Sequence, residues 1–428
     1  MTVTINKKAA AKATISVRMY NVGFGDCFLI KIPTEKGDRR ILVDCGYHSQ
    51  GKGDFTDREL VGQIKADLED HGLDVVIATH RHQDHISGFG ETELWKEITV
   101  EEVWLPFTAK VGGTEDPSFA AWQRLIRAVP NLVDVNGRLR PASVNALRAR
   151  TPEEQQAAAF MLWNARENAL GITNLLKGLR RANGTLGPRR FLPEGGKDAP
   201  YSFDTPALPG VKVHLLGPPR DAKYRAKRAA PSSWGVADDG DLRAEDGALP
   251  SPFGPEWQIP AERLPPRKPF LARSLEAIGR FNTDLLATAS AVDGFLNGES
   301  LVLVLEFGSA RLLLPGDAEV GSWMKILATP EALAVAAGAT FFKVGHHGSH
   351  NATPLMFLEE HLAAKTPAVM STQEGEGQYR KGIPRKEILD VLRERGMSLA
   401  RSDRPMKKAE GIFKPGGGGK WIDCELPC

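Results

Sequence analysis

An apolar run that leads directly into a dense group of histidines constrains this chain more than any other feature. Residues 73–79 read LDVVIAT, and residues 80–85 then place three histidines and an aspartate in six positions. A short continuous apolar run is typical of a buried strand. A turn at the end of such a strand can bring imidazoles and a carboxylate together, and these are the groups that bind zinc-like ions. The pattern H-x-H-x-D-H after a strand therefore favours a metal site over a set of solvated loop histidines.

The histidines of the chain are concentrated in two places. Six of the ten lie either in this first motif or in the second patch, which holds His346, His347 and His350 after the apolar run FFKVG. Either His346 or His347 can fall at the end of the preceding strand. His346 is favoured as a metal ligand because it follows the strand directly, and His347 and Ser349 would then contact the substrate or the loop. His350 and His361 are expected on the surface.

The order of patterns predicts one α/β domain over residues 1–428. Residues 14–46 read as a strand meander, and residues 56–72 as an amphipathic helix in which Leu60, Ile64 and Leu68 are spaced four apart. Residues 108–210 are expected to be a mainly helical insertion, and residues 219–296 a Pro/Gly/Arg-rich surface excursion with a helix. Residues 297–428 resume the strand and helix pattern, beginning with a hairpin over 299–317.

Composition excludes several classes of protein. The formal charge of +2 over 428 residues does not indicate a strongly basic nucleic-acid-binding protein. No stretch has the length and hydrophobicity of a signal peptide or a membrane span. Four cysteines without a CxxC pair are too few for a disulfide scaffold. We therefore expect a cytoplasmic protein that does not contact membranes, and we expect Cys27 and Cys45 to be small buried residues.

The motif THRHQDHISG resembles the signature of the metallo-β-lactamase superfamily. Three further segments match that family's landmarks in the same order: ILVDCG at residues 41–46, LLLPGDAE at 312–319 and KVGHHGS at 343–349. The resemblance covers residues 16–107, 211–219 and 297 to about 400. Within the family, these motifs are most similar to those of the hydrolase domain of the DNA-uptake protein ComEC and its soluble relatives. The similarity lies in the first strand, NVGFGDCFLI at residues 21–30, and in the hairpin at residues 299–317. The resemblance implies a four-layer αββα sandwich.

The same resemblance implies a site with two divalent metal ions, zinc or manganese, that hydrolyses its substrate with a metal-bound hydroxide. One metal would be held by His80 and His82 and the other by Asp84, His85 and His346, with Asp317 bridging both. Asp84 and His347 are the expected catalytic residues. Asp44 is interpreted either as a partner that orients a ligand histidine or as a turn-capping residue. Asp26 is expected to shape a hairpin beside the site.

Two departures from the family pattern bear on function. The family often has a metal-binding histidine in a Pro-Gly-His turn, whereas residues 211–220 read VKVHLLGPPR, with only His214 upstream of the turn. His214 is interpreted as an ordinary strand residue that is dispensable for metal binding. ComEC-like relatives also commonly read Gly-His-Pro where this chain has Ile383 between Gly382 and Pro384.

These observations predict a metal-dependent hydrolase, with cleavage of phosphodiesters or nucleic acid placed first. Basic residues concentrate between Arg380 and Lys408, where they could bind a phosphate-containing small molecule or a nucleic acid. A solvated helix surface is the default interpretation of that stretch. The alternatives are hydrolysis of a lactone, thioester or β-lactam, and a degenerate metal-binding module that acts as a partner in a larger complex. Protein partners are not predicted.

Overall fold

The fold is a sandwich of two β-sheets in a computed structural model that describes residues 13–48, 53–110, 162–163, 169–225, 294–349, 351–374 and 383–428. The first sheet has eight strands in the order β14-β15-β1-β2-β3-β4-β5-β6. These strands are β1 (Thr14–Tyr20), β2 (Phe28–Thr34), β3 (Gly37–Val43), β4 (Leu73–Ile77), β5 (Val100–Pro106), β6 (Arg189–Leu192), β14 (Phe413–Gly416) and β15 (Trp421–Pro427). The last strand of the chain therefore pairs with the first.

The second sheet has seven strands in the order β13-β12-β11-β10-β9-β8-β7. They are β7 (Tyr201–Phe203), β8 (Lys212–Gly217), β9 (Val302–Phe307), β10 (Ala310–Leu314), β11 (Phe341–Lys343), β12 (Ala368–Met370) and β13 (Leu399–Arg401). Strands β10 to β13 are mutually parallel, whereas β7 to β10 alternate in direction. The expected hairpin over 299–317 is confirmed as β9 and β10.

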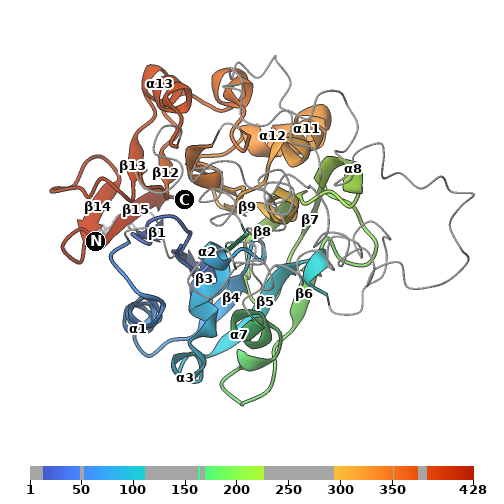
Figure 1. Cartoon of the computed structure of the whole chain (residues 1–428), viewed down its shortest axis with the longest axis vertical. Helices are drawn as coiled ribbons and strands as arrows, with labels where there is room; N and C mark the ends of the chain where they lie inside the picture. Colours follow the sequence, from blue (N-terminus) through green and yellow to red (C-terminus); the bar gives the residue numbers. More distant parts are fainter. Residues whose placement is uncertain are drawn as a thin grey trace, which may run out of the picture.

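Helices cover the outer faces of both sheets. They are α1 (Asp57–Leu68), α2 (Gln83–Ile86), α3 (Thr92–Trp95), α7 (Ala169–Thr173), α8 (Ala222–Arg225), α11 (Val320–Ala328), α12 (Pro330–Ala337) and α13 (Lys386–Glu394). Figure 1 shows α1, α3 and α7 on one side of the molecule and α11, α12 and α13 on the opposite side. None of the helices in the described ranges is both long and apolar enough to cross a membrane.

The distribution of apolar side chains explains the four layers. Successive residues of a strand point to opposite faces of its sheet, so Ile41 and Val43 enter the core between the two sheets while Leu42 packs on the outer face with α1. The second sheet repeats this arrangement, with Leu303 facing inward and Val304 facing α11 and α12. Both sheets are therefore apolar on two faces, as the continuous apolar runs of the sequence require.

Helix α1 shows how the local sequence sets one of these outer layers. Thr56 caps the helix and forms a capping box with Glu59, so that two backbone N–H groups at the helix start are satisfied. Leu60, Ile64 and Leu68 are buried against the first sheet, as their spacing predicts. The helix connects β3 to β4, a parallel pair that needs such a crossover.

The segment expected to be a mainly helical insertion differs from that expectation near its end. Residues 169–178 are helical, but β6 extends the first sheet beside β5 and β7 extends the second beside β8. These two strands are only four and three residues long, so they carry little periodicity of their own. Residues 111–161 and 226–293, which include most of the predicted excursion, lie outside the described residues.

Candidate metal centre

The predicted ligands come from the ends of three strands. His80, His82, Asp84 and His85 follow β4 of the first sheet, and Asp317 follows β10 of the second sheet. His346 and His347 follow β11, the parallel neighbour of β10. The backbone N–H of Leu301, next to β9, donates to the carbonyl of Thr79 at 2.9 Å, which joins the two sheets beside the ligand loop. The motifs that are far apart in the sequence therefore meet at one edge of the sandwich.

Two other segments hold the backbone of the histidine loop. The N–H of Asp26 donates to the carbonyl of Asp84 at 3.1 Å, and the N–H of Cys45 donates to the carbonyl of His85 at 2.8 Å. Gly46 lies so close to this loop that a Cβ atom there would be 2.6 Å from the carbonyl carbon of Asp84. The segments FGDC and VDCG thus fix where the ligand loop runs.

His80 and His82 form the first half of the centre. Both are buried, and Nε2 of His80 lies 2.9 Å from Nδ1 of His82. Burial, with the neighbouring imidazole of His85, lowers the pKa of His80 well below its usual value, and burial lowers the pKa of His82 to about 3. Neutral imidazole is the form that binds a metal ion. Among the described residues His80 groups with His85 and Asp317 as possible ligands, whereas His82 belongs to no such group.

The second half of the centre combines two histidines and two carboxylates. Oδ2 of Asp317 lies 3.2 Å from Nε2 of His85 and 3.7 Å from Nε2 of His347. Oδ2 of Asp84 lies 3.6 Å from the same His347 nitrogen. All four residues are buried. His80 also groups with His85 and Asp317, so Asp317 stands between the two halves.

Asp44 orients His85 from behind. Nδ1 of His85 donates to Oδ2 of Asp44 at 2.8 Å, which leaves Nε2 facing Asp317. The hydroxyl and N–H of Thr79 donate to the same carboxylate, each at 2.7 Å. Burial opposes a charged His85, but the carboxylates of Asp317, Asp44 and Asp84 outweigh burial and hold its pKa well above the usual value. Of the two interpretations of Asp44, the structure supports the orienting role.

The structure places His346 and His347 differently from one another. Nδ1 of His347 donates to the carbonyl of Ser371 at 3.0 Å, so its Nε2 is turned toward Asp84 and Asp317. Nδ1 of His346 lies 4.0 Å from Glu319, and its side chain retains 14% of its exposure. Both residues have positive φ angles, 43° and 56°, which is costly for residues other than glycine and typical of functional sites.

A buried lysine next to the centre was not identified from the sequence. Nζ of Lys343 lies 3.2 Å from Oδ1 of Asp317 and 3.0 Å from the carbonyl of Gly316, and it contacts Asp26. Burial opposes its charge, but the carboxylates of Asp26 and Asp317 outweigh burial and raise its pKa. Its position three residues before His346, within the KVGHHGS motif, is the one signal that could have drawn attention to it.

The remaining histidines lie elsewhere or outside the described residues. On β8, Nδ1 of His214 is 2.7 Å from the hydroxyl of Ser202 and its Nε2 is 3.3 Å from Glu306. Among the residues that the structure describes, no group able to hold a metal ion includes His214. His361 belongs to a helical turn (Phe357–His361) and is half-buried. His350 is outside the described ranges.

Comparisons with known proteins agree with the resemblance over part of the chain. Residues 20–152 match the model of the Metallo-beta-lactamase superfamily, and this range contains the histidine motif. No curated protein matches the chain. Among similar solved structures is the metallo-beta-lactamase fold protein YhfI from Bacillus subtilis, which is 10% identical. That match covers 91% of this chain and 96% of the other, with a TM-score of 0.36.

The family match and the two sheets covered by helices together confirm the predicted fold class. This is the metallo-β-lactamase sandwich, with a group of buried histidines and aspartates at the edge where its strands end. The fold usually binds divalent metal ions, and these residues could hold them. The ComEC-like subtype stays a prediction.

Proposed function

We propose that the chain is a hydrolase with two divalent metal ions, zinc or manganese, and that phosphodiesters are its substrates. The observation that supports this most is the convergence on Asp317. Its Oδ2 atom lies within 3.7 Å of nitrogens of both His85 and His347, while His80 groups with His85 and Asp317 on the other side. A carboxylate between two sets of imidazoles is suited to bridging two cations.

The donor set fits such a pair of ions. Zinc-type sites use imidazole nitrogens and carboxylate oxygens, and a catalytic site keeps one position open. His80, His85 and Asp317 form one group of possible ligands, and Asp84, His85 and His347 form another. His82 lies 2.9 Å from Nε2 of His80, but among the described residues it belongs to no group whose ligand atoms all lie within 4.8 Å of one another. Two divalent ions bound here would lower the pKa of a water and stabilise charge on the attacked and leaving oxygens.

We assign the two adjacent histidines in the reverse of the order expected from the sequence. His347 is the ligand because its Nε2 faces both carboxylates and its other nitrogen is fixed by Ser371. His346 also has a ligand atom within 4.8 Å of Asp317 and His347, but its side chain is less buried and stands beside Glu319, so we assign it to substrate contact. Asp84 is within reach of both His85 and His347 and is the residue best placed to orient the attacking water.

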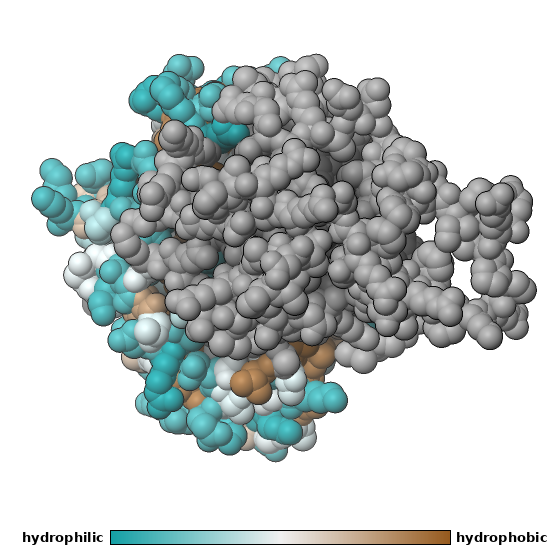
Figure 2. Space-filling view, viewed as in Figure 1, coloured by the Kyte–Doolittle hydropathy of each residue, from teal (hydrophilic) through white to brown (hydrophobic). Residues whose placement is uncertain are grey.

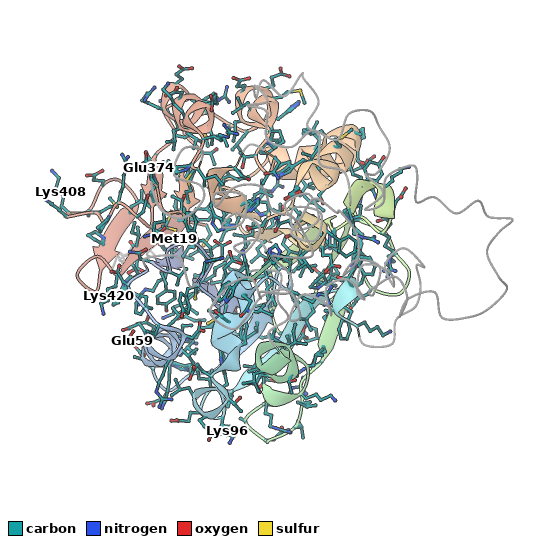
Figure 3. The ribbon with its side chains drawn as sticks, in the orientation of Figure 1. Met19, Glu59, Lys96, Glu374, Lys408 and Lys420 are labelled. Atoms are coloured by element: carbon teal, nitrogen blue, oxygen red, sulfur yellow. The ribbon has the colours of Figure 1, made fainter. Side chains whose placement is uncertain are left out.

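The choice of phosphodiesters as substrates rests on the ComEC-like motifs. The basic residues between Arg380 and Lys408 give this choice little further support, because several of them pair with carboxylates. Lys386 and Arg393 both pair with Asp390 on α13, and Arg401 pairs with Glu374 and Asp403. Figure 2 shows the hydrophilic surface over α13, and Figure 3 shows Lys408 at the outer edge of the molecule. These contacts are typical of a solvated surface, so phosphate recognition is assigned to the metal centre itself.

A substrate panel tests this proposal. We expect metal-loaded protein to hydrolyse an aryl phosphodiester or single-stranded DNA faster than a chromogenic cephalosporin, an aryl lactone or a thioester, because two cations stabilise the charged phosphoryl oxygens. Protein treated with a chelator should lose the activity and regain it when zinc or manganese is restored.

The Asp317→Asn variant serves as the matched control for contaminating nucleases, since it keeps the size of the side chain and removes its charge. A clear preference for the lactone, thioester or cephalosporin would replace phosphodiesters with that substrate class. Absence of any hydrolysis by protein that binds two ions would favour the metal-binding partner module.

A further inference from the structure

The ammonium group of Lys343 contacts three oxygen atoms in the protein interior. Its side chain is 3% exposed, and Nζ contacts three oxygens, from Asp26, Asp317 and the carbonyl of Gly316. A lysine ammonium group has three protons to donate. Each proton therefore has one acceptor, and the group has a single favourable orientation.

These contacts restrict how the carboxylate of Asp317 can lie. Lys343 contacts its Oδ1 atom at 3.2 Å, whereas the imidazole of His85 contacts its Oδ2 atom at the same distance. The two oxygens thus have separate partners. Oδ2 is the oxygen that lies near the histidines, at 3.2 Å from Nε2 of His85 and 3.7 Å from Nε2 of His347.

Asp26 offsets the free-energy cost of burying the ammonium group of Lys343. An ammonium group removed from water is stable in a protein interior only if it is paired and hydrogen-bonded. Asp26 is 2% exposed and comes from the FGDC segment, whose backbone also holds Asp84 at 3.1 Å. The pair therefore links the loop that carries Asp84 to the strand that precedes His346.

We propose that Lys343, held by Asp26, is a positioning residue that keeps Oδ2 of Asp317 turned toward His85 and His347, where the carboxylate would serve both metal positions. This inference rests on the proposed two-metal site. Without Lys343 the Asp317 carboxylate would lose the contact that fixes its orientation, and the site would hold a pair of ions less well. The same contacts explain why a charged residue occupies a buried position in β11, where Phe341 and Phe342 are the neighbours in sequence.

The test removes Lys343 without leaving the Asp26 carboxylate charged and unpaired. Asp26→Asn combined with Lys343→Met replaces both charged groups by neutral ones of similar length, whereas Lys343→Met alone would leave the Asp26 carboxylate unpaired and could unfold the protein. Asp26→Asn alone keeps the contact between Lys343 and Asp317. Arg39→Met is a control for loss of an ion pair, because Arg39 pairs with Asp74 at 2.9 Å near the other ends of β3 and β4.

Two readouts of manganese binding distinguish positioning from a purely structural role. Metal-free protein is titrated with Mn²⁺ and the bound equivalents are counted, and the spin coupling between the two ions is recorded by electron paramagnetic resonance. We expect the wild-type chain and Arg39→Met to bind two coupled ions, and Asp26→Asn, which weakens the hold on Lys343 without removing it, to lose less than the double variant. The double variant should remain folded by circular dichroism, lose the coupled signal, and bind its second ion about tenfold or more weakly.

The possible outcomes separate this inference from the proposed function. A double variant that binds two ions with an unchanged coupled signal would overturn the role of Lys343 and leave the hydrolase intact. A wild-type chain with two coupled ions and no phosphodiesterase activity would overturn the substrate class alone. If the wild-type chain binds no pair of ions, both proposals are wrong.

Discussion

Alanine in place of Asp317 or His85 is expected to abolish metal binding and hydrolysis together. Asp317 lies between the two groups of histidines, and His85 is held toward it by Asp44 at 2.8 Å. Changes in the partners of metal ligands typically cost 10–100-fold in affinity or activity, so loss of a ligand should cost at least about a hundredfold. Elemental analysis and phosphodiester turnover of the purified variants measure the two effects.

The matched control for these variants is His214→Ala. His214 is also a histidine on a strand of the sandwich, but its two nitrogens contact Ser202 and Glu306. Metal content and activity should therefore remain within a fewfold of wild type. If His214→Ala loses one metal equivalent, strand β8 supplies a ligand and the assignment of the first metal position is wrong.

The adjacent histidines extend the same comparison. His347→Ala should lose metal as Asp317→Ala does, because Nε2 of His347 faces two carboxylates. His346→Ala should keep the metal and change the kinetics with substrate instead. The opposite pattern would restore the sequence-based assignment, in which His346 binds the metal and His347 contacts the substrate.

Gly46→Ala is expected to destabilise the protein by about 3 kcal/mol and to lower its metal content, although Gly46 is not a ligand. The cause is a steric clash, because an added Cβ atom would lie 2.6 Å from the carbonyl carbon of Asp84 and 2.7 Å from the backbone nitrogen of His85. Both neighbours are backbone atoms of the ligand loop and can yield only if the loop moves. Urea unfolding and elemental analysis measure the effect.

Gly62→Ala is the control for a glycine-to-alanine change. Gly62 lies within α1, and a Cβ atom there would meet nothing within 4 Å. Because alanine favours the helix over glycine, this variant should be stabilised by about 0.5–1 kcal/mol with unchanged metal content. Equal stability of the two variants would mean that Gly46 does not constrain the ligand loop.

Local sequence patterns predicted those helices and strands whose signals lie within the element itself. Leu60, Ile64 and Leu68 marked α1, and the turn at Gly308 marked the hairpin of β9 and β10. The histidine motif marked the end of β4, because ligands at such spacing require a strand and a tight turn. Each of these features lies within about twenty residues of sequence, where periodicity and turn chemistry suffice.

Features that depend on distant segments could not be predicted in the same way. The strands β6 and β7 are defined by pairing with β5 and β8, and their own residues do not indicate it. The contact between Lys343 and Asp26 joins residues more than three hundred positions apart. The positive φ angles of His346 and His347 turn both side chains away from the alternation expected of a strand end, and the sequence does not show which of the two faces the carboxylates.

Counting the ions bound by the wild-type chain tests the central claim most directly. Asp317 groups with His80 and His85, and its Oδ2 atom also lies 3.7 Å from Nε2 of His347, so these ligands predict close to two equivalents of zinc or manganese per chain. The protein is stripped with a chelator, titrated with either ion, dialysed and examined by elemental analysis. Two equivalents retained per chain agree with the proposed site. No uptake of either ion would contradict it.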